Sequence, residues 1–235
     1  MTRAYFNWSG GKDSALALWK TLQEGKLKVE YLLTSINRFH NRISMHGVRR
    51  ELLEVQAGSL GIPLTTIELP EEPTMPEYEK EMMKKVNWLK EQGITKSIFG
   101  DIFLEDLKKY REEKLAAAGI ECVFPIWKKD THDLMHEFIH EGFKAIVVCV
   151  NEKFLDKSFC GRMIDESFCK DLPSNVDVCG ENGEFHTFVY DGPVFNYSID
   201  FTKGEIVYKE YKAPGTINGK KENYGFYFCD LLTNK

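Results

Sequence analysis

Groups that can bind phosphate are concentrated in one segment near the N-terminus, Ser9-Gly10-Gly11-Lys12-Asp13-Ser14. Its two glycines let the backbone turn sharply, so that successive N–H groups can face an anion. A helical stretch follows directly and adds the positive end of its dipole. Lys12 supplies a mobile cation, Asp13 a carboxylate that can bind Mg²⁺, and the two serines supply hydroxyl groups. Because a polyphosphate bound with a divalent cation uses this set of groups, we predict a polyphosphate site here.

The spacing within this segment excludes two other phosphate-binding motifs. The chain lacks the GxxxxGK[ST] pattern of a Walker loop at this place, and the third glycine of a dinucleotide fingerprint is missing. A plain Gly-Gly turn capped by an aspartate or serine is the simpler alternative. The position between a strand-like run and a helical stretch favours the phosphate site.

A second polar segment has the sequence Cys179-Gly180-Glu181-Asn182-Gly183-Glu184-Phe185-His186-Thr187. Two carboxylates three residues apart, accompanied by an asparagine and a histidine, are costly to bury unless they bind a partner. An exposed hairpin turn is the alternative, since Asn-Gly favours one. Apolar residues on both sides bring the segment against a core instead. We therefore take Glu181, Glu184 and His186 as candidate catalytic residues, and Gly180 and Asn182 as candidates for substrate contact.

Two isolated residues each allow two interpretations. His46 could donate a hydrogen bond to a phosphate or a ribose, or it could cap the helix that it precedes. Arg162 could bind substrate or phosphate, or it could pair with Asp165 at i,i+3 on a surface helix. We favour binding for Arg162 and leave His46 open.

Metal ligands and disulfides are not indicated by the remaining histidines and cysteines. Three histidines recur at a four-residue spacing that would suit metal ligation, but no fourth ligand is near them, so a solvated helix face is favoured: His132, His136 and His140. The six cysteines form no CxxC pair, which favours reduced structural thiols over a zinc site or a redox pair: Cys122, Cys149, Cys160, Cys169, Cys179 and Cys229.

Hydrophobic patterning predicts the elements that must hold these residues. Over the first 150 residues, short strand-like runs alternate with amphipathic helices, which implies crossover connections and a mainly parallel α/β sheet. The predicted strands are 3–8, 29–36, 63–69, 97–99, 121–124 and 144–150, and the predicted helices are 13–24, 46–60, 76–92, 105–118 and 131–142.

The pattern changes after about residue 150. Strand-like runs joined by turns predominate from there, and the turns include Asp191-Gly192-Pro193 and Asn218-Gly219; the runs are 184–190, 197–201, 205–211 and 224–229. We predict a nucleotide-binding domain over 1–125 and a smaller mixed α+β domain over 126–235 that closes over the substrate.

Composition limits the class of protein. With 43% hydrophobic and 29% charged residues, the chain matches a folded globular protein rather than a disordered one. The net charge of −5 disfavours a nucleic-acid partner, while leaving a local basic patch open. The longest apolar stretch, 145–150, is far shorter than the ~20 residues that cross a bilayer, and the first residues lack the apolar run of a signal peptide. We expect a cytoplasmic protein with no membrane partner.

The glycine-rich segment resembles the pyrophosphate loop of the N-type ATP pyrophosphatases, a superfamily with a HUP-like, Rossmann-type nucleotide-binding domain and helices on both faces of its sheet. The second segment resembles the GEGGE-type signature of the diphthine–ammonia ligase family within it. Further segments agree with the family pattern and occur in the family's order along the chain. Among them are Gln56-Ala57, Gly100-Asp101-Ile102, Tyr110-Arg111, Gly161-Arg162 and Asp191-Gly192-Pro193. The resemblance spans about residues 3–211. It departs from the family pattern at Asn182 and His186, which stand where the family usually has a glycine and a glutamate.

The resemblance implies an ATP-dependent amide ligase. ATP with Mg²⁺ would bind at the loop 9–14, helped by His46, Gly100 and Asp101. An acceptor carboxylate, by resemblance diphthine on elongation factor 2, would be adenylated with release of pyrophosphate, and ammonia would displace AMP. Lys12 would offset phosphate charge, Asp13 would hold Mg²⁺, and Glu181 and Glu184 would orient the acceptor or ammonium.

Three matters stay open at the sequence level. His186 could accept a proton from ammonium, in place of the glutamate that would help to hold it. The alternatives to an amide ligase are an enzyme that modifies transfer RNA and a non-catalytic adenine-nucleotide sensor. A homo-oligomer, the ammonia source and the identity of the acceptor are not determined by the residues.

Overall fold

The structure is a computed structural model, and it describes residues 1–44, 46–212 and 223–234. Its N-terminal part is built on a sheet in which β1, β2, β4, β5 and β6 run parallel, and the short β3 pairs antiparallel with β2. The strand order is β4-β2-β1-β5-β6. The strands are β1 (Thr2–Asn7), β2 (Leu27–Asn37), β3 (Arg42–Ile43), β4 (Leu64–Leu69), β5 (Lys96–Ile98) and β6 (Glu121–Val123).

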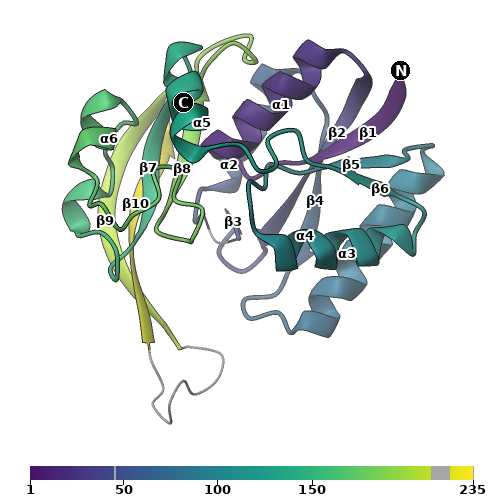
Figure 1. Ribbon diagram of the computed structural model, residues 1–235. Helices are drawn as coiled ribbons and strands as arrows, with labels where there is room; N and C mark the ends of the chain where they lie inside the picture. The colour runs from purple at the N-terminus through teal and green to yellow at the C-terminus, as the bar shows by residue number, and fades with distance from the viewer. Residues whose placement is uncertain (45, 213–222, 235) are drawn as a thin grey trace.

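Helices cover both faces of this sheet, because alternate strand residues are apolar on both sides. Ala4 and Phe6 of β1 pack with one apolar cluster, whereas Tyr5 between them packs with another. The first cluster takes in α1 (Lys12–Glu24) and α2 (Arg50–Leu60). The second takes in α3 (Met75–Glu91) and α4 (Glu105–Ala116). The predicted α/β class with a mainly parallel sheet is confirmed (Figure 1).

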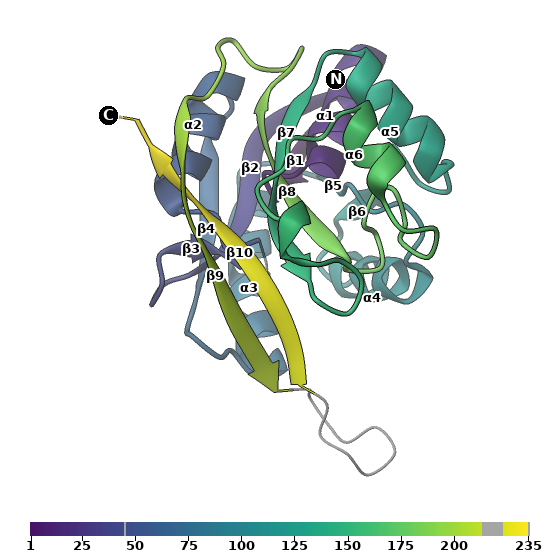
Figure 2. The same ribbon diagram turned by 90° about the vertical axis from the view of Figure 1, so that its left-hand side faces the viewer.

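A second, antiparallel sheet has the order β8-β7-β10-β9. Its strands are β7 (Lys144–Asn151), β8 (Phe185–Asp191), β9 (Phe201–Lys212) and β10 (Asn223–Thr233). The helices α5 (Thr131–His140) and α6 (Glu166–Asp171) and the 3-10 turn η1 (Lys157–Phe159) accompany it, which gives the predicted mixed α+β part. The strands β9 and β10 are its longest strands and pair along one side of this sheet (Figure 2).

One apolar core spans the two sheets. Buried side chains of α1 and α2 belong to the same cluster as Phe138 of α5 and Phe188 of β8. The division of the chain into 1–125 and 126–235 stays a prediction. Among the described residues, no helix combines the length and the apolar character needed to cross a membrane.

Two predicted elements differ from the observed ones, and one observed helix was not predicted. The helix predicted from residue 46 begins at Arg50, because the chain turns through Gly47, with φ of 72°, before the first helical residue. The strand predicted over 197–201 is wrong except for its last residue, since β9 begins at Phe201 and continues through the predicted strand 205–211. The short α6 was not predicted. The predicted turn Asn218-Gly219 lies outside the described residues.

The topology places the predicted site at a reversal of strand order. The strands β1 and β5 are parallel neighbours, and the chain leaves β1 into α1 on one side and β5 into the Gly100-Asp101 segment on the other. In open α/β sheets, the crevice at the carboxyl ends of such strands is where ligands bind.

Candidate active site

The glycine loop, which we define as residues 9–14, adopts a conformation that requires glycine. Gly10 has φ of 80°, in the left-handed region that other residues rarely adopt. Gly11 is the N-cap of α1, and its N–H donates to Ser9 Oγ at 3.2 Å. The hydroxyls of Ser9 and Ser14 lie 2.6 Å apart. The loop therefore closes on its own hydroxyls at the start of a helix.

Lys12 is buried within this loop, with 3% of the residue exposed. Its Nζ donates to both carboxylate oxygens of Asp13, at 2.7 and 2.8 Å. Burial acts to lower the pKa of Lys12, but the charge of Asp13, aided by Glu181, outweighs it and raises that pKa above its ordinary value. The ammonium group thus stays charged in a buried position.

Three carboxylates converge on the N-terminus of α1. Glu181 Oε1 accepts a hydrogen bond from the Ile102 N–H at 2.9 Å, and burial together with Asp13 raises the pKa of Glu181 to about 7. Burial, opposed by Arg111, also raises the pKa of Asp101, and Asp13 raises it further. Because the charge of Asp13 raises the pKa of both Glu181 and Asp101, the three carboxylates lie close enough for their charges to interact. The predicted residues Asp13, Asp101 and Glu181 are therefore brought together.

Gly100, which lies just after β5, allows the chain to pass close to the glycine loop. A Cβ atom on Gly100 would lie 3.0 Å from the Asp13 carbonyl carbon and from the Ser14 nitrogen. Arg111 holds the next residue, with Nη1 2.8 Å from Asp101 Oδ2, and its guanidinium stacks on Phe99 at 4.2 Å. This Asp101 oxygen is buried and receives no hydrogen bond of good geometry.

The donor set fits Mg²⁺ that is bound together with phosphate. No three histidine, cysteine or acidic side chains among the described residues are arranged to hold a metal ion by themselves. Mg²⁺ seldom needs such a cage, since it keeps several waters and uses one or two carboxylates plus substrate phosphates. Asp13, with Asp101 and Glu181 near it, would supply those carboxylates, and a cation would relieve the repulsion between their charges.

The strand β8 contacts the glycine loop from the second sheet. Thr187 Oγ1 accepts the main-chain N–H of Lys12 at 3.0 Å, although the two residues are 175 positions apart. His46 Nδ1 lies 3.4 Å from the Thr187 carbonyl oxygen. A Cβ on Gly11 would lie 3.1 Å from His46 Cε1, so this side of the loop has little room for a side chain.

His186 stacks on His46, with ring centroids 4.6 Å apart and planes at 27°. Burial lowers the pKa of His46 to about 4, and the charge of Lys12 adds to that effect. Burial, His46 and Lys12 likewise hold the pKa of His186 well below its ordinary value. Both imidazoles are therefore neutral at pH 7, and they form an uncharged wall beside the loop.

Glu184, predicted to be catalytic, is instead bonded within its own loop. It is 1% exposed, and its carboxylate accepts from the N–H of Asp177 at 3.0 Å and from the N–H and Nδ2 of Asn182 at 2.8 and 3.0 Å. Gly180, with φ of 70°, lets this loop pass close to the Phe185 ring and carbonyl. The segment is therefore not the exposed hairpin turn considered above. Its Glu184, Asn182 and Gly180 shape the loop that presents Glu181, and their predicted contacts with substrate stay predictions.

Arg162 lies among residues of the second part of the chain. Its Nη2 donates to Asp171 Oδ2 at 2.8 Å and to Ser167 Oγ at 3.2 Å, and its guanidinium stacks on Phe159 and Phe168. The partner is therefore Asp171 rather than the predicted alternative Asp165, and a role in binding stays a prediction. The three histidines of α5 are exposed, as the solvated-face interpretation predicts.

Three residues at the site were missed as functional candidates. All three stand inside motifs that we quoted. Thr187 bonds the Lys12 N–H, which is far away in the sequence, whereas Arg111 pairs with Asp101 in the loop that precedes its own helix. Gln56 gave one signal, a polar residue on a helix that is otherwise apolar on that side. It is fully buried and bonded to the glycine loop.

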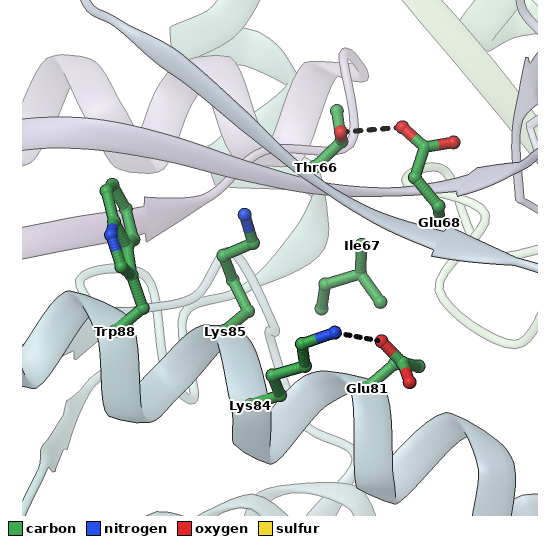
Figure 3. A pocket seen from close by; sticks show the side chains of 7 residues that line it. All are labelled: Thr66, Ile67, Glu68, Glu81, Lys84, Lys85 and Trp88. Atoms are coloured by element: carbon green, nitrogen blue, oxygen red, sulfur yellow. Dashed lines mark hydrogen bonds and ion pairs between the residues drawn. The ribbon is translucent and has the colours of Figure 1, made fainter.

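A groove of about 410 Å³ lies elsewhere, between β4 and α3 (Figure 3). Lys84 and Lys85 extend from α3 toward Ile67 on the strand, and Trp88 stands at one end. Lys84 pairs with Glu81 at 3.7 Å. None of the predicted site residues lines this groove.

Comparison with known proteins gives matches over most of the chain. Residues 2–121 match the family model described as diphthamide synthase N-terminal domain, and residues 130–222 match the diphthamide synthase C-terminal domain. The chain is 25% identical over 222 residues to diphthine–ammonia ligase of Bos taurus and 24% identical to that of Homo sapiens, and both alignments cover 85% of this chain and 82% of the relative.

A solved structure, that of a predicted subunit of tRNA methyltransferase from Methanocaldococcus jannaschii, is 18% identical. Its TM-score is 0.36, and the match covers 67% of this chain and 82% of that one.

Proposed function

The chain belongs to the diphthamide synthase family, and we propose that this ATP-dependent carbon–nitrogen ligase adenylates an acceptor carboxylate, releases pyrophosphate and transfers ammonia to the acyl group. The observation that carries the proposal is the glycine loop. It joins a left-handed glycine and a helix N-terminus to a buried, charged Lys12 and three crowded carboxylates. Such a loop suits a polyphosphate that arrives with a cation.

In the first step, an oxygen of the acceptor carboxylate attacks the α-phosphorus of ATP. The bond between the α-phosphorus and the bridging oxygen breaks, and pyrophosphate leaves. Lys12 supplies positive charge beside the phosphates, and the positive end of the α1 dipole adds to it. Mg²⁺, held by Asp13, would neutralise charge on the phosphate oxygens.

In the second step, ammonia attacks the carbonyl carbon of the acyl adenylate. The carbon–nitrogen bond forms, the bond to the AMP oxygen breaks, and the nitrogen loses a proton. Glu181, with a pKa of about 7, can take up a proton at neutral pH, which suits an acid–base role there. The neutral imidazoles of His46 and His186 add no positive charge that would repel ammonium.

The names of the relatives point to diphthine as the acceptor. By the resemblance given above, that acceptor is carried by elongation factor 2, which would make this factor the protein partner. We infer a cytoplasmic enzyme acting on a protein, with ATP and ammonium as its small substrates.

The test uses the full chain with MgATP, ammonium and elongation factor 2 that carries diphthine. Pyrophosphate, AMP and the amide in the acceptor are measured separately, with Asp13→Asn as the control variant. Asparagine keeps an oxygen for Lys12 Nζ, so the variant should fold while losing the carboxylate. Pyrophosphate release that needs the acceptor and is lost in the variant supports the proposal. ATP binding without turnover would indicate a nucleotide sensor, and pyrophosphate release that needs transfer RNA would indicate a modifying enzyme.

A further inference from the structure

Gln56 is a buried amide on α2 that bonds the glycine loop. Its exposed fraction is 0%, and its neighbours on the helix, Leu53 and Ala57, belong to the apolar core. An amide in such a place costs free energy unless its donors and acceptor are satisfied. The contacts that satisfy it therefore show what it does.

Each polar group of the Gln56 side chain has a partner that fits it. Oε1 accepts from the indole N–H of Trp8 at 3.0 Å, and Nε2 donates to the carbonyl oxygens of Gly10 at 3.0 Å and Val189 at 2.7 Å. An indole N–H can only donate and a carbonyl can only accept, so these partners determine which way round the amide stands. The side chain joins Trp8, which directly follows β1, to the glycine loop and to β8.

The bond to Gly10 controls the direction of the loop peptide. A peptide unit is planar and trans, so its carbonyl oxygen and the following N–H point in opposite directions. The Gly10 carbonyl is held by Gln56 and also by the Val189 N–H at 2.9 Å, which turns the Gly11 N–H the other way, toward Ser9 Oγ. Without these bonds, the peptide between two glycines is free to rotate and to present its oxygen where an anion would bind.

The packing is as close as glycine permits. A Cβ on Gly10 would lie 2.8 Å from Gln56 Oε1, inside the distance that real Cβ atoms show. The left-handed φ of Gly10 and the position of Gln56 are thus matched to one another.

We propose that Gln56 is a positioning residue, which fixes the peptide between Gly10 and Gly11 so that the glycine loop is preorganised for the phosphates of ATP. The proposal rests on the proposed function for the nature of the ligand. It goes beyond that function by assigning the loop's conformation to a fully buried amide whose polar groups all bond protein atoms.

The test compares Gln56→Met with Ser59→Ala. Methionine has nearly the volume of glutamine and removes the three hydrogen bonds. Ser59 is equally buried on the same helix, and its hydroxyl bonds Tyr197 main-chain atoms of the second part, but it does not contact the glycine loop. It therefore controls for loss of a buried contact between α2 and the second part.

We expect Gln56→Met to weaken MgATP binding by about 10- to 100-fold, as a displaced binding group does, and to speed hydrogen exchange at the Gly11 and Lys12 amides in the free protein. Ser59→Ala should match wild type in both measurements. If Gln56→Met does not fold, Gln56→Glu keeps the shape and the acceptor for Trp8 but sets a carboxylate against two carbonyl oxygens, and the same two effects are expected.

The two measurements separate the proposals. Wild type that binds no ATP, combined with faster loop exchange in the Gln56 variant, contradicts the proposed function and leaves the positioning role standing. Wild-type affinity and exchange in a folded Gln56 variant, or equal losses in Ser59→Ala, overturn the positioning role.

Discussion

Glu181→Gln is expected to make the protein more stable at alkaline pH. In the folded chain the pKa of Glu181 is raised from the ordinary 4.5 to about 7, by burial first and by Asp13 second. Below pH 4.5 the carboxyl is protonated in both the folded and the unfolded chain, so it contributes nothing to the pH dependence. Between pH 4.5 and 7 the folded chain binds the proton more tightly, and stability falls as the pH rises. Above pH 7 the full cost of the charged carboxylate is present.

The size of this cost follows from the two pKa values. At about 1.4 kcal/mol for each pH unit, the difference is about 3 kcal/mol. Glutamine removes the charge and keeps an oxygen that can accept from the Ile102 N–H. For a domain of this size, about 3 kcal/mol raises the melting temperature by about 6–12 °C.

The assay is urea or thermal unfolding of wild type and variant from pH 4.5 to 8.5 without nucleotide. The difference in unfolding free energy should be near zero at pH 4.5 and should grow to its full size above pH 7. Glu184→Gln is the matched control from the same loop, because its buried carboxylate accepts three hydrogen bonds and the amide would set donor against donor. That variant should lose about 1–3 kcal/mol. Equal stability of Glu181→Gln and wild type at pH 8.5, or a gain that is the same at every pH, would refute the reasoning.

Three other outcomes are expected. Asp13→Asn should lower pyrophosphate release at least about 10²-fold with an unchanged circular dichroism spectrum, since the carboxylate that would hold Mg²⁺ is lost but Lys12 keeps an oxygen partner. Removal of divalent cations with a chelator should weaken ATP binding measured by calorimetry, because Asp101, Asp13 and Glu181 repel an unaccompanied polyphosphate. His186→Ala should slow amide formation more than pyrophosphate release, by only about tenfold, since the lowered pKa of His186 makes its imidazole a weak base. Rapid quench measures the rates of the two steps separately. Equal losses of rate in both steps would indicate that His186 has a packing role.

The elements around the glycine loop could be predicted because their signals are local. Alternating strands and helices, a Gly-Gly pair at a strand–helix junction and an aspartate in the first helical turn are each readable within about ten residues. The boundary of α2 was less readable, because the turn through Gly47 that delays its start depends on a contact between Gly47 N and the Ile43 carbonyl.

The contacts that complete the site could not be predicted, since they join distant segments. Thr187 reaches the Lys12 N–H only after β8 has been added to the antiparallel sheet and packed against α1. Glu184 has the same residue type as Glu181 and stands three positions away. It nevertheless turns inward to three donors, whereas Glu181 faces Ile102 and the crowded carboxylates. The sequence therefore predicts the same role for both glutamates, and only the fold of the loop shows that their environments differ.

The arrangement of charge explains why the loop suits a phosphate that comes with a cation. Lys12 is neutralised by Asp13 in the free protein, so it offers little net charge to an incoming anion. Burial first, and the charge of Asp13 in addition, raises the pKa of Asp101 and of Glu181, so the folded chain bears a cost whenever these carboxylates are charged. In the proposed reaction, a divalent cation carried by the nucleotide would relieve the repulsion between these charges and would let Lys12 turn from Asp13 toward the phosphates. By the proposed function, nucleotide and cation together would therefore bind more tightly than either alone.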